Sequence, residues 1–228
     1  MERCWYEVVP LRNDEGWLVV LSSPSSVVLP KVTFPDVSGP VHHRTRLLEG
    51  IAEAVAANGY ANTTIADIVR LAGVSRRTFY EHFATKAECF IALYEAASRN
   101  TLAVLREAID PAHKWQTQLD QALAAYLKSM AQNPALLRTL FVEILGLGAE
   151  GLAARRRVNQ EICRFMLQVV NSDDAGHHSK LALTEEMAVA VVGGINELVL
   201  KAIEEGRAGQ LVQLVAPASQ LVRTVTQP

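Results

Sequence analysis

Helical periodicity dominates this chain and constrains its fold more than any other feature. From His43 onward, apolar residues recur every three to four positions, the spacing that places them along one face of an α-helix. Gly, Pro and Asn residues separate the periodic segments at positions where helices commonly begin or end. The pattern predicts an all-α protein with about nine helices. The expected helices are 43–58, 64–73, 75–83, 85–109, 114–132, 134–146, 150–171, 184–206 and 210–226.

Charge and cysteine usage exclude several classes of protein. The 228 residues include 22 Lys and Arg and 24 Asp and Glu, a net charge of −2, so any nucleic-acid site must be local rather than a result of bulk charge. Cys4, Cys89 and Cys163 stand far apart, which argues against a disulfide framework and a zinc knuckle. Uninterrupted apolar runs such as Trp17–Leu21 are too short for a signal segment or a membrane span. We therefore expect a cytoplasmic protein that makes no membrane contact.

Residues 1–40 have a different composition from the rest of the chain. They hold five of the nine prolines and alternate short β-rich runs with turn signals. Cys4–Leu11 and Trp17–Leu21 flank a glycine-containing loop and are compatible with a hairpin. The simpler interpretation is a disordered tail that orders on contact, or a misassigned translation start upstream of the true one. A DNA-binding arm is disfavoured because acidic residues outnumber basic ones here.

A helix-turn-helix pattern occupies residues 64–83. Two short helices begin at the capping residues Thr64 and Ser75, and Gly73 lies between them where the backbone must turn sharply. A helix-turn-helix places its second helix in the major groove of DNA, so this spacing points to a DNA-binding function.

The second helix of this motif has an inner and an outer face. Phe79 and Phe83 are one turn apart and point into the core, which leaves Arg77, Thr78 and Glu81 facing outward. Arginine recognises guanine through a bidentate fork, and the threonine methyl group fits against thymine. Glu81 is the acidic residue on this outer face. It either repels phosphate or accepts a hydrogen bond from cytosine.

The segment from Thr63 to Lys86 reads TTIADIVRLAGVSRRTFYEHFATK and resembles the DNA-binding signature of the tetracycline-repressor (TetR) family of bacterial regulators. The resemblance covers about residues 43–95 and extends further only in helical layout. It implies a homodimer in which three N-terminal helices bind operator DNA and a helical C-terminal domain releases the DNA when a small effector binds. The expected organisation is an N-terminal extension (1–40), a helix-turn-helix DNA-binding domain (41–88) and a helical ligand-binding and dimerisation domain (89–228).

The resemblance also implies roles for individual residues at the DNA. It puts Arg76, Arg77 and Thr78 at base edges or nearby phosphates, Tyr80 and His82 at the backbone, and Lys86 at a phosphate. A cation in the first turn of a helix opposes the helix dipole, and a phosphate bound by Lys86 would remove that conflict. The N-terminus of the helix capped by Thr64 is a further candidate for a phosphate. Arg44 and Arg46 in the first helix are candidates for backbone contacts, and simple solvation explains them equally well.

The C-terminal half is expected to hold the effector in an apolar pocket, because ligand pockets are mostly apolar. Such a pocket suits an apolar or amphipathic molecule, for example a lipid-like acid or a drug. The helix that begins near Lys86 is the expected lever between pocket and DNA, since Phe90 and Tyr94 follow at one-turn intervals. The candidate pocket residues are Phe90, Tyr94, Trp115, Tyr126, Met130, Phe141, Ile144, Phe165, Met166 and Val169.

The helix expected at 184–206 is apolar nearly all round and must therefore be covered on two sides. The glycines at its middle would let a second copy of the helix approach closely, so we expect the homodimer to form here. A rim ion pair is expected between Glu197 and Lys201. The candidate interface residues are Val189, Gly193, Gly194, Glu197, Leu200 and Lys201.

The sequence shows no motif typical of an enzyme active site, a metal site or a cofactor site. The leading hypothesis is a DNA-binding repressor controlled by a small molecule. The alternatives are a helical binding or assembly protein that keeps the helix-turn-helix as a scaffold, and an activator or ligand-independent regulator of the same fold.

Overall fold

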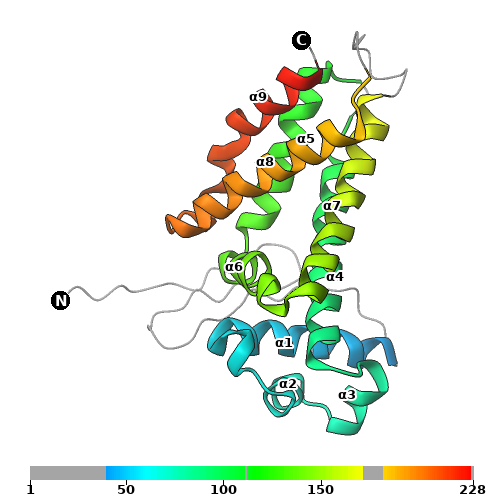
Figure 1. The fold of residues 1–228 in the computed structure, drawn as a ribbon, viewed down its shortest axis with the longest axis vertical. Helices are drawn as coiled ribbons and strands as arrows, with labels where there is room; N and C mark the ends of the chain where they lie inside the picture. The colour runs from blue at the N-terminus through cyan, green and yellow to red at the C-terminus, as the bar shows by residue number, and fades with distance from the viewer. Residues whose placement is uncertain (1–39, 111, 172–181, 227–228) are drawn as a thin grey trace, which may run out of the picture.

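The computed structural model describes residues 40–110, 112–171 and 182–226, and this part of the chain contains helices and no strand (Figure 1). The hairpin expected near the N-terminus lies outside the described residues. The elements are α1 (Pro40–Asn62), α2 (Ile65–Ala72), α3 (Arg76–His82), α4 (Lys86–Glu107), α5 (Trp115–Ala131), α6 (Pro134–Val142), the 3₁₀-helix η1 (Glu143–Leu147), α7 (Ala149–Val170), α8 (Glu185–Glu204), the 3₁₀-helix η3 (Ala208–Leu214) and α9 (Val215–Thr226). The all-α prediction and the expected number of about nine helices are thus confirmed for these residues.

The first helix differs from its prediction at both ends. It begins at Pro40 rather than His43, which suits proline because the first helical position needs no N–H donor. Gly59 interrupts it with φ 74° and ψ 158°, so the expected glycine stop is present, but one further helical turn follows before Asn62.

Two later helices were predicted too long. The segment expected at 134–146 is α-helical only to Val142 and continues as η1, next to Gly146 and Gly148, which are poor helix formers. The single helix expected at 210–226 is η3 followed by α9. Pro217 lies in the first turn of α9 and has no N–H to donate to Gln213, so one continuous α-helix cannot pass through this point.

The helices form two stacked parts (Figure 1). Helices α1, α2 and α3 make the lower part, and α4 and α7 run upward from it to α5, α8 and α9. Helix α6 and η1 pack on α1 between the two parts. Within the described residues, none of the helices has the length and hydropathy that a membrane crossing requires.

One buried cluster connects the lower part to the upper part. Leu47, Ile51 and Phe79 from the lower helices share this cluster with Phe90 of α4 and Ile144 of η1, and all five side chains are fully buried. The boundary expected between residues 88 and 89 falls inside α4 and inside this core. Because a close-packed core transmits displacement, movement of α4 or η1 acts directly on the lower helices.

Candidate DNA-binding surface and effector cavity

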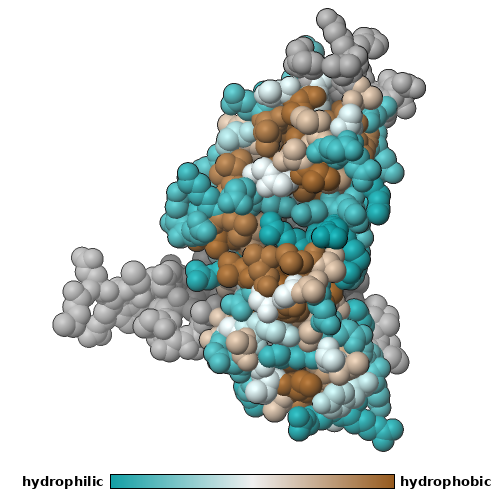
Figure 2. All heavy atoms as spheres, viewed as in Figure 1, coloured by the Kyte–Doolittle hydropathy of each residue, from teal (hydrophilic) through white to brown (hydrophobic). Residues whose placement is uncertain are grey.

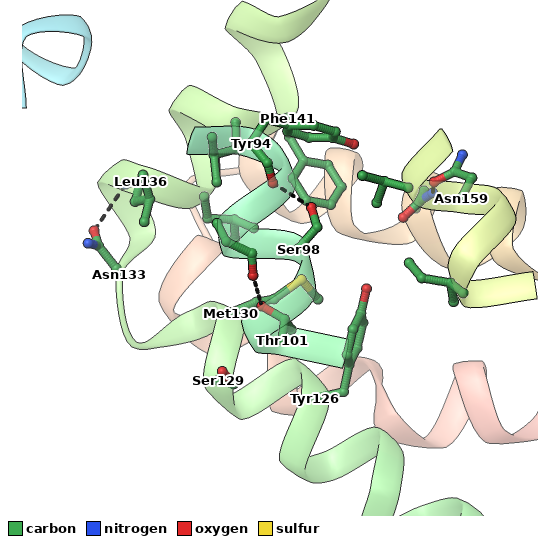
Figure 3. A pocket seen from close by; sticks show the side chains of 16 residues that line it. Tyr94, Ser98, Thr101, Tyr126, Ser129, Met130, Asn133, Leu136, Phe141 and Asn159 are labelled. Carbon is green, nitrogen blue, oxygen red and sulfur yellow. Dashed lines mark hydrogen bonds between the residues drawn. The ribbon is translucent and has the colours of Figure 1, made fainter. Parts of the chain in front are cut away.

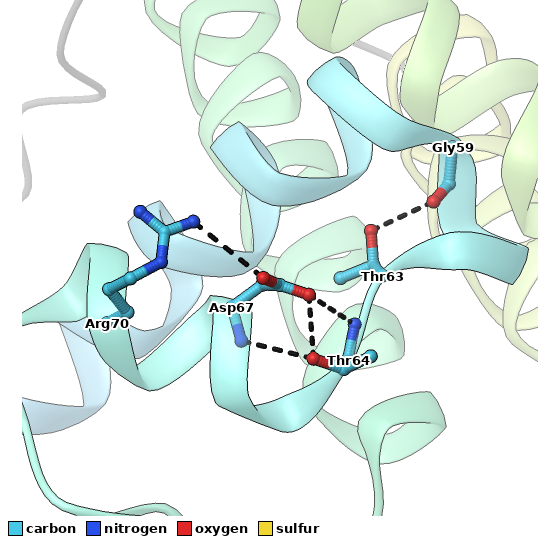
Figure 4. Close-up of polar contacts among 5 residues, drawn as sticks. All are labelled: Gly59, Thr63, Thr64, Asp67 and Arg70. Carbon is cyan, nitrogen blue, oxygen red and sulfur yellow. Dashed lines mark hydrogen bonds and ion pairs between the residues drawn. The ribbon is translucent and has the colours of Figure 1, made fainter.

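The turn between α2 and α3 is built by local capping. The side chain of Thr64 accepts a hydrogen bond from the Asp67 N–H, and the Asp67 carboxylate accepts from the Thr64 N–H at 3.0 Å, which completes the expected capping box (Figure 4). Gly73 ends α2 with φ 61°, a conformation that favours glycine. Ser75 then caps α3 by accepting from the Thr78 N–H. These contacts fix the angle at which α3 leaves α2.

The expected inner and outer faces of α3 are present. Phe79 and Phe83 are buried, and the ring of Tyr80 packs edge-on against Phe79 while more than half of its side chain stays exposed. Arg76 and Arg77 are exposed, and Thr78 and His82 are half-buried beside them. Helix α3 therefore presents two arginines and a tyrosine on one accessible surface.

Glu81 holds Arg77 along the outer face of α3. The Arg77 Nε donates to the Glu81 Oε1 at 3.0 Å, one turn apart, and the two side chains are 89% and 55% exposed. Such an exposed pair contributes only about 0.3 to 0.5 kcal/mol, so DNA can break it at little cost. Arg76 makes no ion pair with any described residue. Arg76 is thus the free cation of α3, and Arg77 is oriented.

A carboxylate already occupies the N-terminus of α2. Hydrogen bonds from Thr64 hold the pKa of Asp67 below its usual value, and Arg70 lowers it further. The Thr64 hydroxyl donates to the Asp67 carboxylate at 2.6 Å, as Figure 4 shows. A phosphate at this helix end would therefore meet a negative group, which weakens the expected role of Thr64 in phosphate binding.

Lys86 is half-buried and bonds to groups within the protein rather than pointing freely away from it. Its ammonium donates to the carbonyl oxygens of Tyr60 at 2.7 Å and Thr63 at 2.6 Å, and lies 4.2 Å from the centre of the Tyr60 ring. Partial burial lowers the pKa of Lys86. Carbonyls at the end of α1 thus relieve the conflict with the helix dipole for which a DNA phosphate was expected. One ammonium hydrogen remains for such a phosphate, since lysine has three.

Arg44 and Arg46 also make contacts within the protein. The guanidinium of Arg44 lies 5.3 Å from the centre of the Phe83 ring. Arg46 donates to the carbonyl oxygen of Gly73 at 2.9 Å and so ties α1 to the turn before α3. These two residues support the position of α3.

Tyr60 is the point at which three elements meet. Its N–H, freed by the break at Gly59, donates to the Glu143 carboxylate of η1 at 2.9 Å. Its ring packs 5.2 Å from that of Phe90 on α4, and its carbonyl accepts from Lys86. We call Tyr60, Lys86, Phe90 and Glu143 the Tyr60 junction. Nothing in the periodicity singles out Glu143, because its partner is 83 positions away in the chain.

A cavity of about 110 Å³ lies between α4, α5, α6, α7 and α8 (Figure 3). Tyr94, Tyr126, Met130 and Phe141 line it, as four of the ten predicted pocket residues. The sequence did not predict its polar lining, although Asn196, which directly follows the apolar Ile195 in α8, was a visible signal. These polar residues are Ser98, Thr101, Ser129, Asn133, Asn159 and Asn196.

The remaining predicted pocket residues separate into two groups. Trp115, Phe165, Met166 and Val169 line a second, smaller cavity of about 70 Å³ between α4, α5, α7 and α9. Phe90 and Ile144 line neither of these cavities and are fully buried in the core that the lower helices share with α4 and η1. Their periodic positions identified them as inward-facing but could not show which core they enter.

The predicted interface residues lie on the outer side of α8. Val189 is 53% exposed. Gly193 faces open space, since an added Cβ would meet no atom within 4 Å. Leu200 is half-buried. At Gly194, in contrast, an added Cβ would lie 2.9 Å from Leu221 of α9, so this glycine serves packing within one subunit.

The ion pair expected between Glu197 and Lys201 is not formed. The Lys201 ammonium instead lies 4.0 Å from Glu205, one turn further along, and both Glu197 and Lys201 are exposed. A lysine can pair with a carboxylate on either side, and here the acid at the helix end is nearer.

Comparison with known proteins agrees with this architecture. The sequence profile described as "Bacterial regulatory proteins, tetR family" matches residues 47–93. The fold is similar to that of Salmonella enterica GusR, with a TM-score of 0.66, 18% identity and coverage of 87% of this chain and 100% of that one. It is also similar to the fatty acid degradation regulator FadR of Bacillus halodurans, with a TM-score of 0.65, 18% identity and coverage of 82% and 96%.

A third similar structure is the transcriptional regulator FadR of Bacillus subtilis in complex with stearoyl-CoA, with a TM-score of 0.61, 18% identity and coverage of 80% and 98%. The fold and the exposed α3 define a helix-turn-helix protein with a second helical part above it. The profile match shows that residues 47–93 are similar to the DNA-binding helices of the tetR family of bacterial regulatory proteins, and the three solved structures show the same fold over most of the chain.

The contacts of Lys86 lead to a prediction about stability. Lys86→Met should lower the free energy of unfolding by about 1 to 2 kcal/mol, because the carbonyls of Tyr60 and Thr63 lose a charged donor. Arg76→Met removes the same charge from an exposed site without a partner in the described residues and should change stability by less than about 0.5 kcal/mol. Urea unfolding followed by circular dichroism measures both variants. Equal midpoints would show that Lys86 does not hold α1 to α4.

Proposed function

We propose that this chain is a repressor that binds operator DNA as a homodimer and leaves it when a small molecule occupies the cavity between α4 and α8. The observation that carries the proposal is the orientation of α3, which two buried phenylalanines anchor while Arg76 and Arg77 face outward. In this proposal residues 41–88 contact DNA, and residues 89–228 bind the ligand and the second subunit. The repressor acts in the bacterial cytoplasm, where its operator lies.

The chemistry of α3 suits the major groove. Arg76 and Arg77 are candidates for bidentate contacts with guanine, each worth about 1 to 3 kcal/mol of discrimination. Tyr80 and His82 on its flanks are placed to reach the phosphate backbone. Glu81 keeps the Arg77 guanidinium extended along the helix, which lowers the entropy that Arg77 loses when it meets a base.

The Tyr60 junction supports ligand control, because elements that line the cavity end there. Tyr94 lies one turn after Phe90 on α4, and Phe141 lies two residues before Glu143. A ligand that shifts α4 or α6 therefore shifts the groups that hold Tyr60 at the end of α1. Release requires that the ligand bind the DNA-incompetent state more tightly, and that difference sets the extent of release.

The outer surface of α8 and η3 supports a homodimer. Met187, Val189 and Val212 are large apolar side chains that are at least 42% exposed, and Figure 2 shows hydrophobic surface over this upper region. Exposed apolar patches on a soluble protein often mark contact surfaces. A symmetric pair would place two α3 helices on half-sites about 34 to 36 Å apart.

Operator binding is tested with duplex DNA from the region upstream of the gene, measured by fluorescence anisotropy. Arg77→Ala should weaken binding by about 1 to 3 kcal/mol and relax the preference at one base pair of each half-site. Arg156→Ala removes the same charge from an exposed position on α7 and serves as the control. The proposal fails if the unchanged protein prefers this DNA no more than random duplex, or if the two variants lose affinity equally.

The homodimer is tested with Gly193→Glu. A carboxylate at this open position would be buried between two copies of α8 without a partner, so we expect monomers that also lose operator affinity. Gln168→Glu adds the same charge to the exposed surface of α7 and should leave the dimer intact. Light scattering at equal concentrations distinguishes these results. A Gly193→Glu protein that remains dimeric would contradict this interface.

A further inference from the structure

The cavity between α4 and α8 contains polar groups and lacks charge. Among the described residues that line it there is no Asp, Glu, Lys, Arg or His side chain. Arg155 is close enough to lower the pKa of Tyr94, against the larger effect of burial, but it does not line the cavity. A carboxylate bound there would lose hydration without gaining an adjacent cation, which is costly.

Two phenol hydroxyls are available as hydrogen-bond donors in this cavity. Tyr94 of α4 and Tyr126 of α5 both line it, and neither hydroxyl bonds to another group in the described part of the chain. Burial raises the pKa of Tyr94 to about 12 and also raises that of Tyr126, so both phenols keep their protons at neutral pH. An unpaired donor that lines a cavity is available to an occupant, so these hydroxyls can serve as recognition groups.

An amide pair from α7 and α8 also lines the cavity. The Nδ2 of Asn196, a residue of which only 8% is exposed, donates to the Oδ1 of Asn159 at 3.1 Å. This bond leaves the NH₂ group of Asn159 and the carbonyl oxygen of Asn196 without partners in the described residues, so the pair offers one donor and one acceptor. Ser98 and Thr101 donate instead to carbonyls of their own helix. The phenols and the amide pair therefore remain available to an occupant, together with the hydroxyl of Ser129 and the NH₂ group of Asn133.

The second cavity extends the site with walls that are apolar except for Gln118. Ile162 of α7 lines both cavities and therefore lies where the two come together. The walls of the second cavity beyond Ile162 include Trp115, Leu119 and Phe165. Each cavity alone is smaller than the roughly 150 Å³ that holds a benzene molecule, which limits the occupant to a small compound.

We propose that the effector is a small uncharged molecule with a hydrogen-bonding head of the amide type and a short apolar tail. Tyr94, Tyr126 and the Asn159–Asn196 pair bind the head, and the tail passes Ile162 into the second cavity. This inference rests on the proposed function for its regulatory meaning. It narrows the apolar or amphipathic ligand expected from the sequence to a neutral one, which excludes a lipid-like acid.

The test compares hexanamide with hexanoate, which have the same chain and differ in charge. Isothermal titration calorimetry at pH 8 without DNA measures binding of each to the full chain. Hexanamide should bind at least tenfold more tightly than hexanoate, with a Kd on the order of 1 mM or below, as expected for so few atoms. Equal or tighter binding of hexanoate, or no binding of hexanamide up to about 10 mM, would overturn the proposal.

Matched variants place the ligand in the cavity. Asn159→Leu should reduce hexanamide affinity at least tenfold. Gln160→Leu, which also replaces an amide side chain by leucine but at an exposed neighbour, should not. Thermal melting checks that both variants fold. If Asn159→Leu does not fold, Tyr126→Phe, which deletes only a hydroxyl, provides an independent test and should also lower hexanamide affinity. Unchanged affinity in the variants that fold would overturn the assignment.

The fluorescence of Trp115 tests whether the tail binds in the second cavity, and release of operator DNA tests the two proposals separately. Hexanamide should change the fluorescence of the unchanged protein but not of Trp115→Phe, and an unchanged emission would overturn the placement of the tail. If hexanamide binds but leaves the operator complex intact, the ligand class is supported and the proposed ligand control is contradicted. If only a charged ligand releases the DNA, ligand control is supported and the neutral ligand is overturned.

Discussion

The contact between the Lys86 ammonium and the carbonyls at the end of α1 is the constraint on which the rest of this structure depends. A lysine in the first turn of a helix is unfavourable by itself, and the carbonyls of Tyr60 and Thr63 remove that penalty only if α1 and α4 meet at this point. The meeting point in turn fixes α2 and α3, which pack on α1. The direction in which Arg76 and Arg77 project from α3 therefore follows from a contact within the protein.

The same point joins the DNA-binding helices to the cavity. Glu143 accepts from the Tyr60 N–H, and Phe90 packs on the Tyr60 ring, so η1 and α4 both act on one residue. Because one core runs from Phe79 to Ile144, the two parts do not move as independent bodies joined by a linker. A small change in cavity shape can thus reach α3 through packed side chains and two hydrogen bonds.

Local rules account for the part of the fold that the sequence predicted well. The caps at Thr64 and Ser75 depend on neighbours within four residues, and both are formed. The Glu143 contact joins residues 83 positions apart, so no spacing rule could predict it. The cavity shows the same limit. Periodicity identified Tyr94 and Phe90 as inward-facing, but only the packing of α6 and α7 decides that Tyr94 meets the cavity and Phe90 does not.

Amide hydrogen exchange at Tyr60 is the most direct test that Glu143 links the upper helices to the DNA-binding helices. The central claim predicts that Glu143→Gln speeds exchange of the Tyr60 amide by about tenfold, since a neutral acceptor holds the N–H less strongly than a carboxylate. Glu161→Gln, the same change at an exposed position on α7, should leave the rate unchanged. Equal Tyr60 exchange rates in the unchanged protein and in Glu143→Gln would contradict the account.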